Sequence, residues 1–198
     1  MLSSKNLKLV FLHCSGGNKT DYAELLSHIA KSINAEILSF DAPLIKDEAK
    51  SKYFWFNKDE THPRRDAIES DFDYALKFIK DKILALKIAL SDIILLGHSQ
   101  GGAMASVVAT ELNLKLAVSI VGDLPYNINY TNNSETPILW LESKNDTYLS
   151  SERKASYTLF KDINANLSYN ILENSSHFDF DLDKDNIANL IINALEND

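Results

Sequence analysis

The chain has 198 residues, 45% of them hydrophobic, and is therefore long enough to bury a substantial core as one α/β domain covering residues 1–198. Its formal net charge of −8 argues against the basic surface that nucleic acid or an anionic membrane requires. Its single cysteine, Cys14, cannot form an internal disulfide, no zinc-ligand cluster is visible, and no segment approaches the roughly 20 apolar residues that span a bilayer. We expect a cytoplasmic protein with no metal, no cofactor and no stable membrane insertion.

Apolar runs rich in β-branched residues predict six strands, most of them separated by stretches of helical periodicity. The predicted strands are Lys8–Leu12, Ala35–Phe40, Asp92–Leu96, Lys115–Val121, Pro137–Glu142 and Asn166–Leu172. Helices are predicted around Tyr22–Ile33, Asp66–Leu90, Ala103–Ala109 and Ile187–Leu195, and loops at Ile45–Asp59 and Tyr126–Thr136. This alternation is typical of an α/β fold with a mostly parallel sheet and helices on both faces, and we expect no lid domain.

The residues Gly97-His98-Ser99-Gln100-Gly101 directly follow the apolar run Ile93–Leu96. A serine flanked two residues away by glycines, between a strand and a helix, is the pattern of a nucleophile elbow. The serine lies at the tip of a strained turn, so its neighbours must be small for the helix to pack close to the strand. The pattern predicts an α/β-hydrolase fold with Ser99 as nucleophile. The alternative is a passive serine in an ordinary strand-to-helix turn.

A serine hydroxyl is a weak nucleophile at neutral pH, so Ser99 needs a nearby base and an acid that orients this base. In α/β-hydrolases the acid and then the histidine follow the serine, on loops after later strands. His177 is the only histidine after Ser99, and Asp146 closely follows the strand predicted to end at Glu142. We therefore predict a triad of Ser99, His177 and Asp146. Other acids remain candidates for the orienting role: Glu142, Asp179 and Asp181.

Acyl transfer also requires hydrogen-bond donors aimed at the developing oxyanion, usually backbone N–H groups. One donor is predicted to be the amide of Gln100, the residue after the nucleophile. The other is expected from the loop His13–Gly17 after the first strand, and we choose the amide of Ser15. The glycines of this loop also fit a generic turn or a phosphate loop, but the G-x-G-x-x-G and Walker lysine patterns are absent.

These residues together resemble the phospholipase/carboxylesterase group of α/β-hydrolases, which includes the acyl-protein thioesterases. The similarity extends in order through Leu12-His13 and the glycine loop, Ala42-Pro43, Trp55-Phe56, the elbow with Gly102-Ala103, Leu124-Pro125, Thr136–Leu139, Asp146 and His177. The resemblance implies a cytosolic, cofactor-free serine hydrolase acting on carboxylic esters or thioesters, with a small molecule or an acylated protein as substrate. It also implies that Trp55, Phe56 and Leu124 lie near the acyl pocket.

The chain departs from the family pattern at three places. Cys14 occupies a loop position that is usually glycine, Glu142-Ser143 replaces the usual His-Gly before the acid, and Tyr148-Leu149-Ser150 replaces the Val-Pro that commonly follows it. These departures indicate a divergent member whose substrate need not be the family's best-known one. The short loops between Pro43 and Trp55 and between Pro125 and Pro137 predict a short or medium acyl group. Three alternatives remain open: a peptidase or lactonase on the same scaffold, a non-catalytic relative that binds an acyl ligand or a protein, and Trp55 and Phe56 acting only as core residues.

Overall fold

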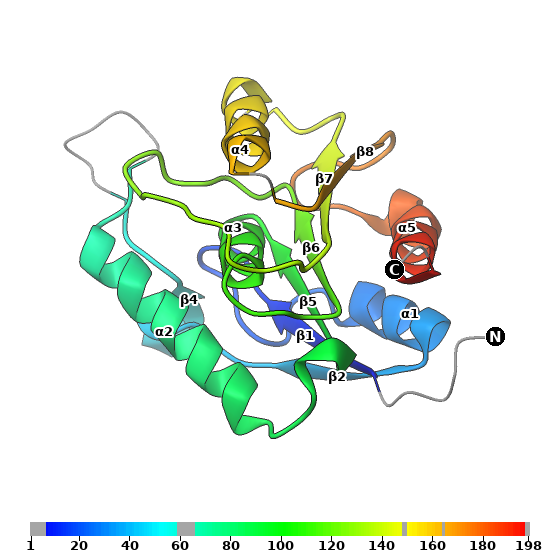
Figure 1. Cartoon of the computed structure of the whole chain (residues 1–198), viewed down its shortest axis with the longest axis horizontal. Helices are drawn as coiled ribbons and strands as arrows, with labels where there is room; N and C mark the ends of the chain where they lie inside the picture. The colour runs from blue at the N-terminus through cyan, green and yellow to red at the C-terminus, as the bar shows by residue number, and fades with distance from the viewer. Residues whose placement is uncertain (1–6, 59–65, 148–149, 164, 197–198) are drawn as a thin grey trace.

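The computed structural model describes residues 7–58, 66–147, 150–163 and 165–196. Its centre is a parallel sheet of six strands in the order β2-β1-β5-β6-β7-β8 (Figure 1). The strands are β1 (Leu7–Leu12), β2 (Ala35–Ser39), β5 (Ile93–His98), β6 (Leu116–Ile120), β7 (Ile138–Ser143) and β8 (Leu167–Leu172). All six predicted strands are confirmed to within two residues at their ends.

Helices cover both faces of this sheet. One face carries α1 (Ala23–Ile33) and α5 (Lys184–Glu196), and the other carries α2 (Glu69–Ala85), α3 (Gln100–Ala109) and α4 (Ser150–Asp162) (Figure 1). Because side chains alternate along a strand, Leu9 and Phe11 of β1 pack in the core layer of α1 and α5, whereas Val10 and Leu12 pack in the opposite layer. The predicted α/β fold with helices on both faces is confirmed.

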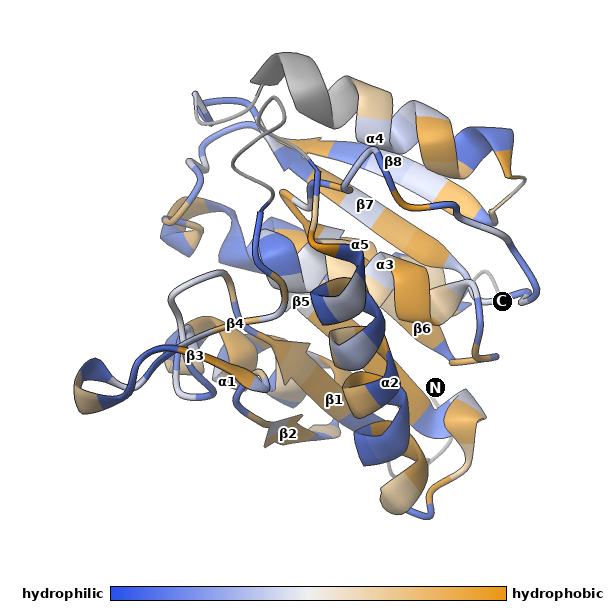
Figure 2. Cartoon of the chain, turned by 90° about the vertical axis from the view of Figure 1, so that its left-hand side faces the viewer, coloured by the Kyte–Doolittle hydropathy of each residue, from blue (hydrophilic) through white to orange (hydrophobic). Residues whose placement is uncertain are grey.

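Burial follows the position of each strand in the sheet. The central strands β1, β5 and β6 are buried along their whole length, and they are largely orange in Figure 2. The edge strands β2 and β8 are partly exposed, as parallel strands at the margin of a sheet must be. Among the described helices, none is both long and apolar enough to cross a membrane.

Three regions differ from the sequence prediction. The helix predicted over Asp66–Leu90 is shorter, since α2 begins at Glu69 and ends at Ala85, and Leu90 lies in a 3₁₀ turn. The predicted loop Ile45–Asp59, whose last residue lies outside the described ranges, contains an antiparallel hairpin of β3 (Leu44–Asp47) and β4 (Lys52–Phe54). Its strands have only four and three residues, too short for a periodic signal. Helix α4 was not predicted, because its sequence has few apolar residues. Short 3₁₀ turns occupy Glu48–Lys50, Leu90–Asp92 and Asp181–Asp183.

Candidate active site

The carboxyl ends of neighbouring parallel strands bring distant loops together. Ser99 directly follows β5, Asp146 lies three residues after β7, and His177 lies five residues after β8. The loop that contains Ser15 follows β1, the strand that lies next to β5 in the sheet. Residues far apart in the sequence therefore meet at one edge of the sheet, where open α/β sheets bind their ligands.

Ser99 has the strained backbone of a nucleophile elbow, with φ 53° and ψ −117°. The turn is possible only because its flanks lack side chains. A Cβ added to Gly97 would lie 2.1 Å from the carbonyl oxygen of Gly101, and one added to Gly101 would lie 2.2 Å from the carbonyl oxygen of Leu12. Both distances are to backbone atoms, which cannot move aside without displacing β1, β5 or α3.

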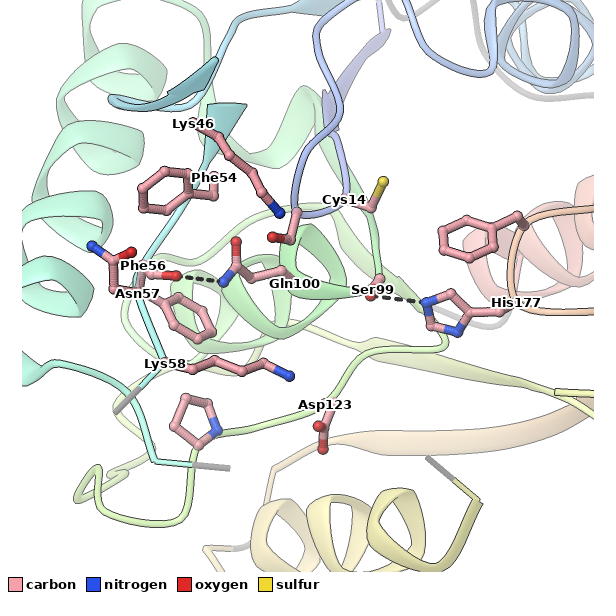
Figure 3. Close-up of a pocket in the computed structure, with 13 residues that line it drawn as sticks. Cys14, Lys46, Phe54, Phe56, Asn57, Lys58, Ser99, Gln100, Asp123 and His177 are labelled. Carbon is pink, nitrogen blue, oxygen red and sulfur yellow. Dashed lines mark hydrogen bonds between the residues drawn. The ribbon is translucent and has the colours of Figure 1, made fainter. Parts of the chain in front are cut away.

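Two hydrogen bonds connect Ser99, His177 and Asp146. The Ser99 hydroxyl lies 3.1 Å from His177 Nε2, and His177 Nδ1 lies 2.6 Å from Asp146 Oδ2 (Figure 3 shows the first of these). Asp146 and His177 are both buried, whereas Glu142, in β7, is half-buried and Asp179 is exposed. The structure thus brings together the predicted nucleophile, base and acid. Asp146 contacts His177 Nδ1, the ring nitrogen to which an orienting acid would bind.

His98 supports the loop that contains His177. Its Nε2 donates a hydrogen bond to the His177 backbone carbonyl at 2.7 Å, and its ring contacts Tyr22, Phe178 and Phe180. Burial, reinforced by the neighbouring His177, lowers the pKa of His98 to about 3. His98 is therefore a neutral, buried connection between the elbow and the His177 loop, a role that the sequence analysis missed although the residue lies inside the motif.

The loop after β1 is held from two sides by buried polar groups. His13 Nδ1 donates to the Cys14 carbonyl at 2.7 Å, while its Nε2 accepts from the Ala42 N–H at 3.0 Å. The indole N–H of Trp55 donates to the His13 carbonyl at 2.8 Å. Desolvation lowers the pKa of His13, so the ring is neutral and can keep both bonds. These contacts fix the segment that contains Ser15.

Gln100 has a structural role in addition to its place after the serine. Its side-chain oxygen accepts from the Trp55 N–H at 2.8 Å, and its side-chain NH₂ donates to the Phe56 carbonyl at 2.7 Å (Figure 3). The backbone N–H of Gln100 begins α3, where the first four amides have no intrahelical acceptor. The N-terminus of this helix is accordingly a favourable place for a developing negative charge.

A pocket of about 440 Å³ opens beside Ser99 (Figure 3). The predicted residues Ser15, Phe56, Ser99, Gln100 and His177 line it. Further lining residues, which the sequence analysis did not select, are Cys14, Lys46, Phe54, Asn57, Lys58, Asp123, Pro125 and Phe178. Four of these residues, Lys46, Phe54, Asn57 and Lys58, belong to the predicted loop Ile45–Asp59, whose mixture of charged and aromatic residues was the sequence feature that could have indicated them. Within the described residues, no three His, Cys, Asp or Glu side chains are arranged to hold a metal ion.

Trp55 and Leu124 occupy places other than the expected pocket wall. Both are fully buried, and neither is among the described residues that line the pocket. Trp55 lies behind the residues that line the pocket, where its indole N–H donates a hydrogen bond to the His13 carbonyl. Leu124 packs into the core between the lining residues Asp123 and Pro125. Their role is therefore to support the loops around the pocket.

Cys14 is the other nucleophilic side chain near Ser99. It is buried, and desolvation raises the pKa of its thiol to about 11. Because the thiolate is the reactive form, this cysteine is a poor nucleophile at neutral pH. Ser99, which has a histidine within hydrogen-bond distance, is the better placed group.

Comparisons with known proteins agree with this architecture. In Candida glabrata, protein phosphatase methylesterase 1 is 23% identical over 121 residues, which cover 60% of this chain and 31% of that protein. Esterase PE8 has a similar structure, with a TM-score of 0.77, 20% identity, and coverage of 96% of this chain and 93% of that one. Acyl-protein thioesterase 2 of Zea mays has a TM-score of 0.72 and 19% identity, with coverage of 98% and 96%.

The matched curated relative is thus much longer than the aligned segment, and the solved structures are similar in fold at low identity. The family assignment depends on a broader match. The sequence profile described as phospholipase/carboxylesterase matches residues 3–187, nearly the whole chain. The chain belongs to the phospholipase/carboxylesterase family of α/β-hydrolase enzymes.

Proposed function

We propose that this protein is a serine hydrolase that cleaves carboxylic esters or thioesters through an acyl-enzyme intermediate. The observation that carries the proposal is the chain of hydrogen bonds from Asp146 through His177 to Ser99, at the wall of an open pocket. Nucleophilic catalysis by serine requires this sequence of acid, base and hydroxyl. A module that only binds a ligand has no need for it.

In the proposed acylation step, Ser99 Oγ attacks the ester carbonyl while His177 Nε2 accepts the hydroxyl proton. The Nδ1–H of His177 donates to Asp146, which keeps the ring in the required tautomer and stabilises the imidazolium. His177 then gives the proton to the departing alcohol or thiol. Water attacks the acyl-enzyme by the same route in reverse, and the carboxylic acid leaves.

The developing oxyanion needs donors next to Ser99. We assign this role to the backbone amides of Gln100, at the start of α3, and of Ser15, in the loop fixed by His13 and Trp55. Preorganised donors of this kind are worth several kcal/mol, about 3 to 4 for one donor, because they need no reorientation during the reaction.

Short or medium acyl groups fit the pocket best. Eleven residues separate Pro43 from Trp55 and another eleven separate Pro125 from Pro137, so few loop residues are available to extend the wall. A long acyl chain gains about 0.8 kcal/mol for each CH₂ that is removed from water, and this gain stops where the wall ends. The open pocket also fits a thioester on a larger molecule, such as an acylated protein in the cytoplasm.

Hydrolysis of 4-nitrophenyl esters with 2 to 16 acyl carbons tests the proposal. We expect kcat/KM to peak at short or medium chains. Ser99→Ala and His177→Ala should abolish turnover, whereas Ser32→Ala, in α1, should not. Wild-type turnover in Ser99→Ala would refute the mechanism. A steady rise to the 16-carbon ester would refute the short-chain preference.

A further inference from the structure

Among the described residues that line the pocket beside Ser99, positive side chains outnumber negative ones, although the protein is acidic. Lys46 and Lys58 both line it, and Asp123 is the one acid among its described lining residues. The Asp123 carboxylate accepts a hydrogen bond from the Ser156 hydroxyl at 3.2 Å. The described lining residues therefore carry an excess of one positive charge, in a chain whose formal net charge is −8.

The two lysines reach the pocket from different segments. Lys46 lies in β3, and its ammonium lies 3.8 Å from the position that a Cβ on Gly16 would occupy, close to the Ser15 loop. Lys58 lies after β4, and its side chain extends into the pocket toward Asp123 (Figure 3). Neither ammonium forms an ion pair with any described residue.

Several other lysines of the chain are held in ion pairs. Lys50 pairs with Asp47 at 3.3 Å, and Lys80 pairs with Glu111. Two cations that face one pocket without such partners among the described residues attract an anion there, since an incoming carboxylate need not displace a described partner.

The position of His177 shows which part of a substrate meets these lysines. His177 must deliver a proton to the leaving group, so the leaving group has to lie on the His177 side of Ser99. Figure 3 shows Lys46, Lys58, Phe54 and Phe56 across Ser99 from His177. The acyl group extends toward this second side, along the two phenylalanines and toward the ammonium groups.

We propose that Lys46 and Lys58 form a subsite for an acyl chain that ends in a carboxylate, so that the preferred substrates are monoesters or monothioesters of short dicarboxylic acids. This inference rests on the proposed hydrolase function. The phenylalanines contact the methylene groups, and the lysines bind the terminal carboxylate. The products are the free dicarboxylate and the alcohol or thiol.

Two esters of equal chain length test the subsite. Mono(4-nitrophenyl) adipate ends in a carboxylate, and 4-nitrophenyl methyl adipate ends in a neutral methyl ester. At low ionic strength, with non-enzymatic hydrolysis subtracted, we expect kcat/KM to favour the charged ester by about 3- to 10-fold, the size of two solvent-exposed charge interactions. The preference should weaken in 0.5 M NaCl, because salt screens exposed charges.

Single substitutions test which lysine causes the preference for the charged ester. Lys46→Met and Lys58→Met should each reduce it about 2- to 5-fold and leave the neutral ester unaffected. Lys31→Met in α1, on the opposite face of the sheet, removes the same charge and should keep the preference. Equal slowing of both esters by Lys46→Met would overturn the subsite, since the lysine would then act on the reaction itself.

Two further outcomes separate the subsite from the hydrolase function. Hydrolysis of the neutral ester without any preference for the charged one would overturn the subsite and leave the hydrolase intact. No turnover of either ester would overturn both. A lysine-dependent preference for 3-carboxyphenyl hexanoate over phenyl hexanoate would place the anion on the leaving group and thereby overturn the acyl assignment.

Discussion

Replacement of His98 should change how the stability of the protein depends on pH. Its pKa is about 3 in the folded protein and 6.5 in the unfolded chain, so the unfolded state binds the extra proton between these values. The contribution of neutral His98 to the free energy of unfolding is therefore fully present well above pH 6.5 and is lost as the pH falls from 6.5 toward 3. Between pH 7 and pH 5 the loss amounts to about 2 kcal/mol, or roughly 4 to 8 °C in melting temperature for a chain of this size.

Urea unfolding of the wild type, His98→Phe and His98→Gln at pH 7, 6 and 5 measures this contribution. Neither variant titrates at this position, so both should lose about 2 kcal/mol less than the wild type between pH 7 and pH 5. At pH 7 we expect His98→Phe to be less stable by about 1 to 3 kcal/mol, because the His177 carbonyl loses its donor. His98→Gln keeps a donor and should lose less. An identical pH dependence in all three proteins would refute the reasoning.

Four other substitutions test the site. Asp146→Asn should lower kcat by about 10⁴-fold, whereas Glu142→Gln should have a mild effect, and the reverse ranking in ester kinetics would reassign the acid. Gln100→Ala removes the side-chain partners of the buried Trp55 N–H and Phe56 carbonyl. Urea unfolding should therefore show a decrease of about 2 to 4 kcal/mol in the free energy of unfolding. Gly101→Ala places a Cβ 2.2 Å from the Leu12 carbonyl oxygen. It should cost more than about 3 kcal/mol, and an unchanged melting temperature would contradict the steric argument.

The sequence was most informative where one residue type is physically required. The strained turn at Ser99 tolerates only glycine at its crowded flanks, and His177 had no competitor after the serine, so the nucleophile and base candidates were identified from the motif and chain order. The pattern of buried strands likewise predicted the sheet, since β1, β5 and β6 are apolar along their length.

The pocket wall was harder to predict because it depends on how side chains divide between core and surface. An aromatic pair such as Trp55 and Phe56 gives one sequence signal, yet only Phe56 lines the pocket, while Trp55 bonds a backbone carbonyl behind it. Lys46 and Lys58 lie in a segment without periodicity, and their convergence depends on the β3–β4 hairpin. Composition alone contains no information about that convergence.

Covalent labelling with a fluorophosphonate tests the central proposal most directly, because such reagents phosphonylate a serine that is activated by a base. Intact mass spectrometry followed by peptide mapping should find one adduct per chain, on Ser99, with labelling abolished in Ser99→Ala and strongly reduced in His177→Ala. Stoichiometric labelling of a different residue, or equal labelling of Ser99→Ala and the wild type, would contradict the account.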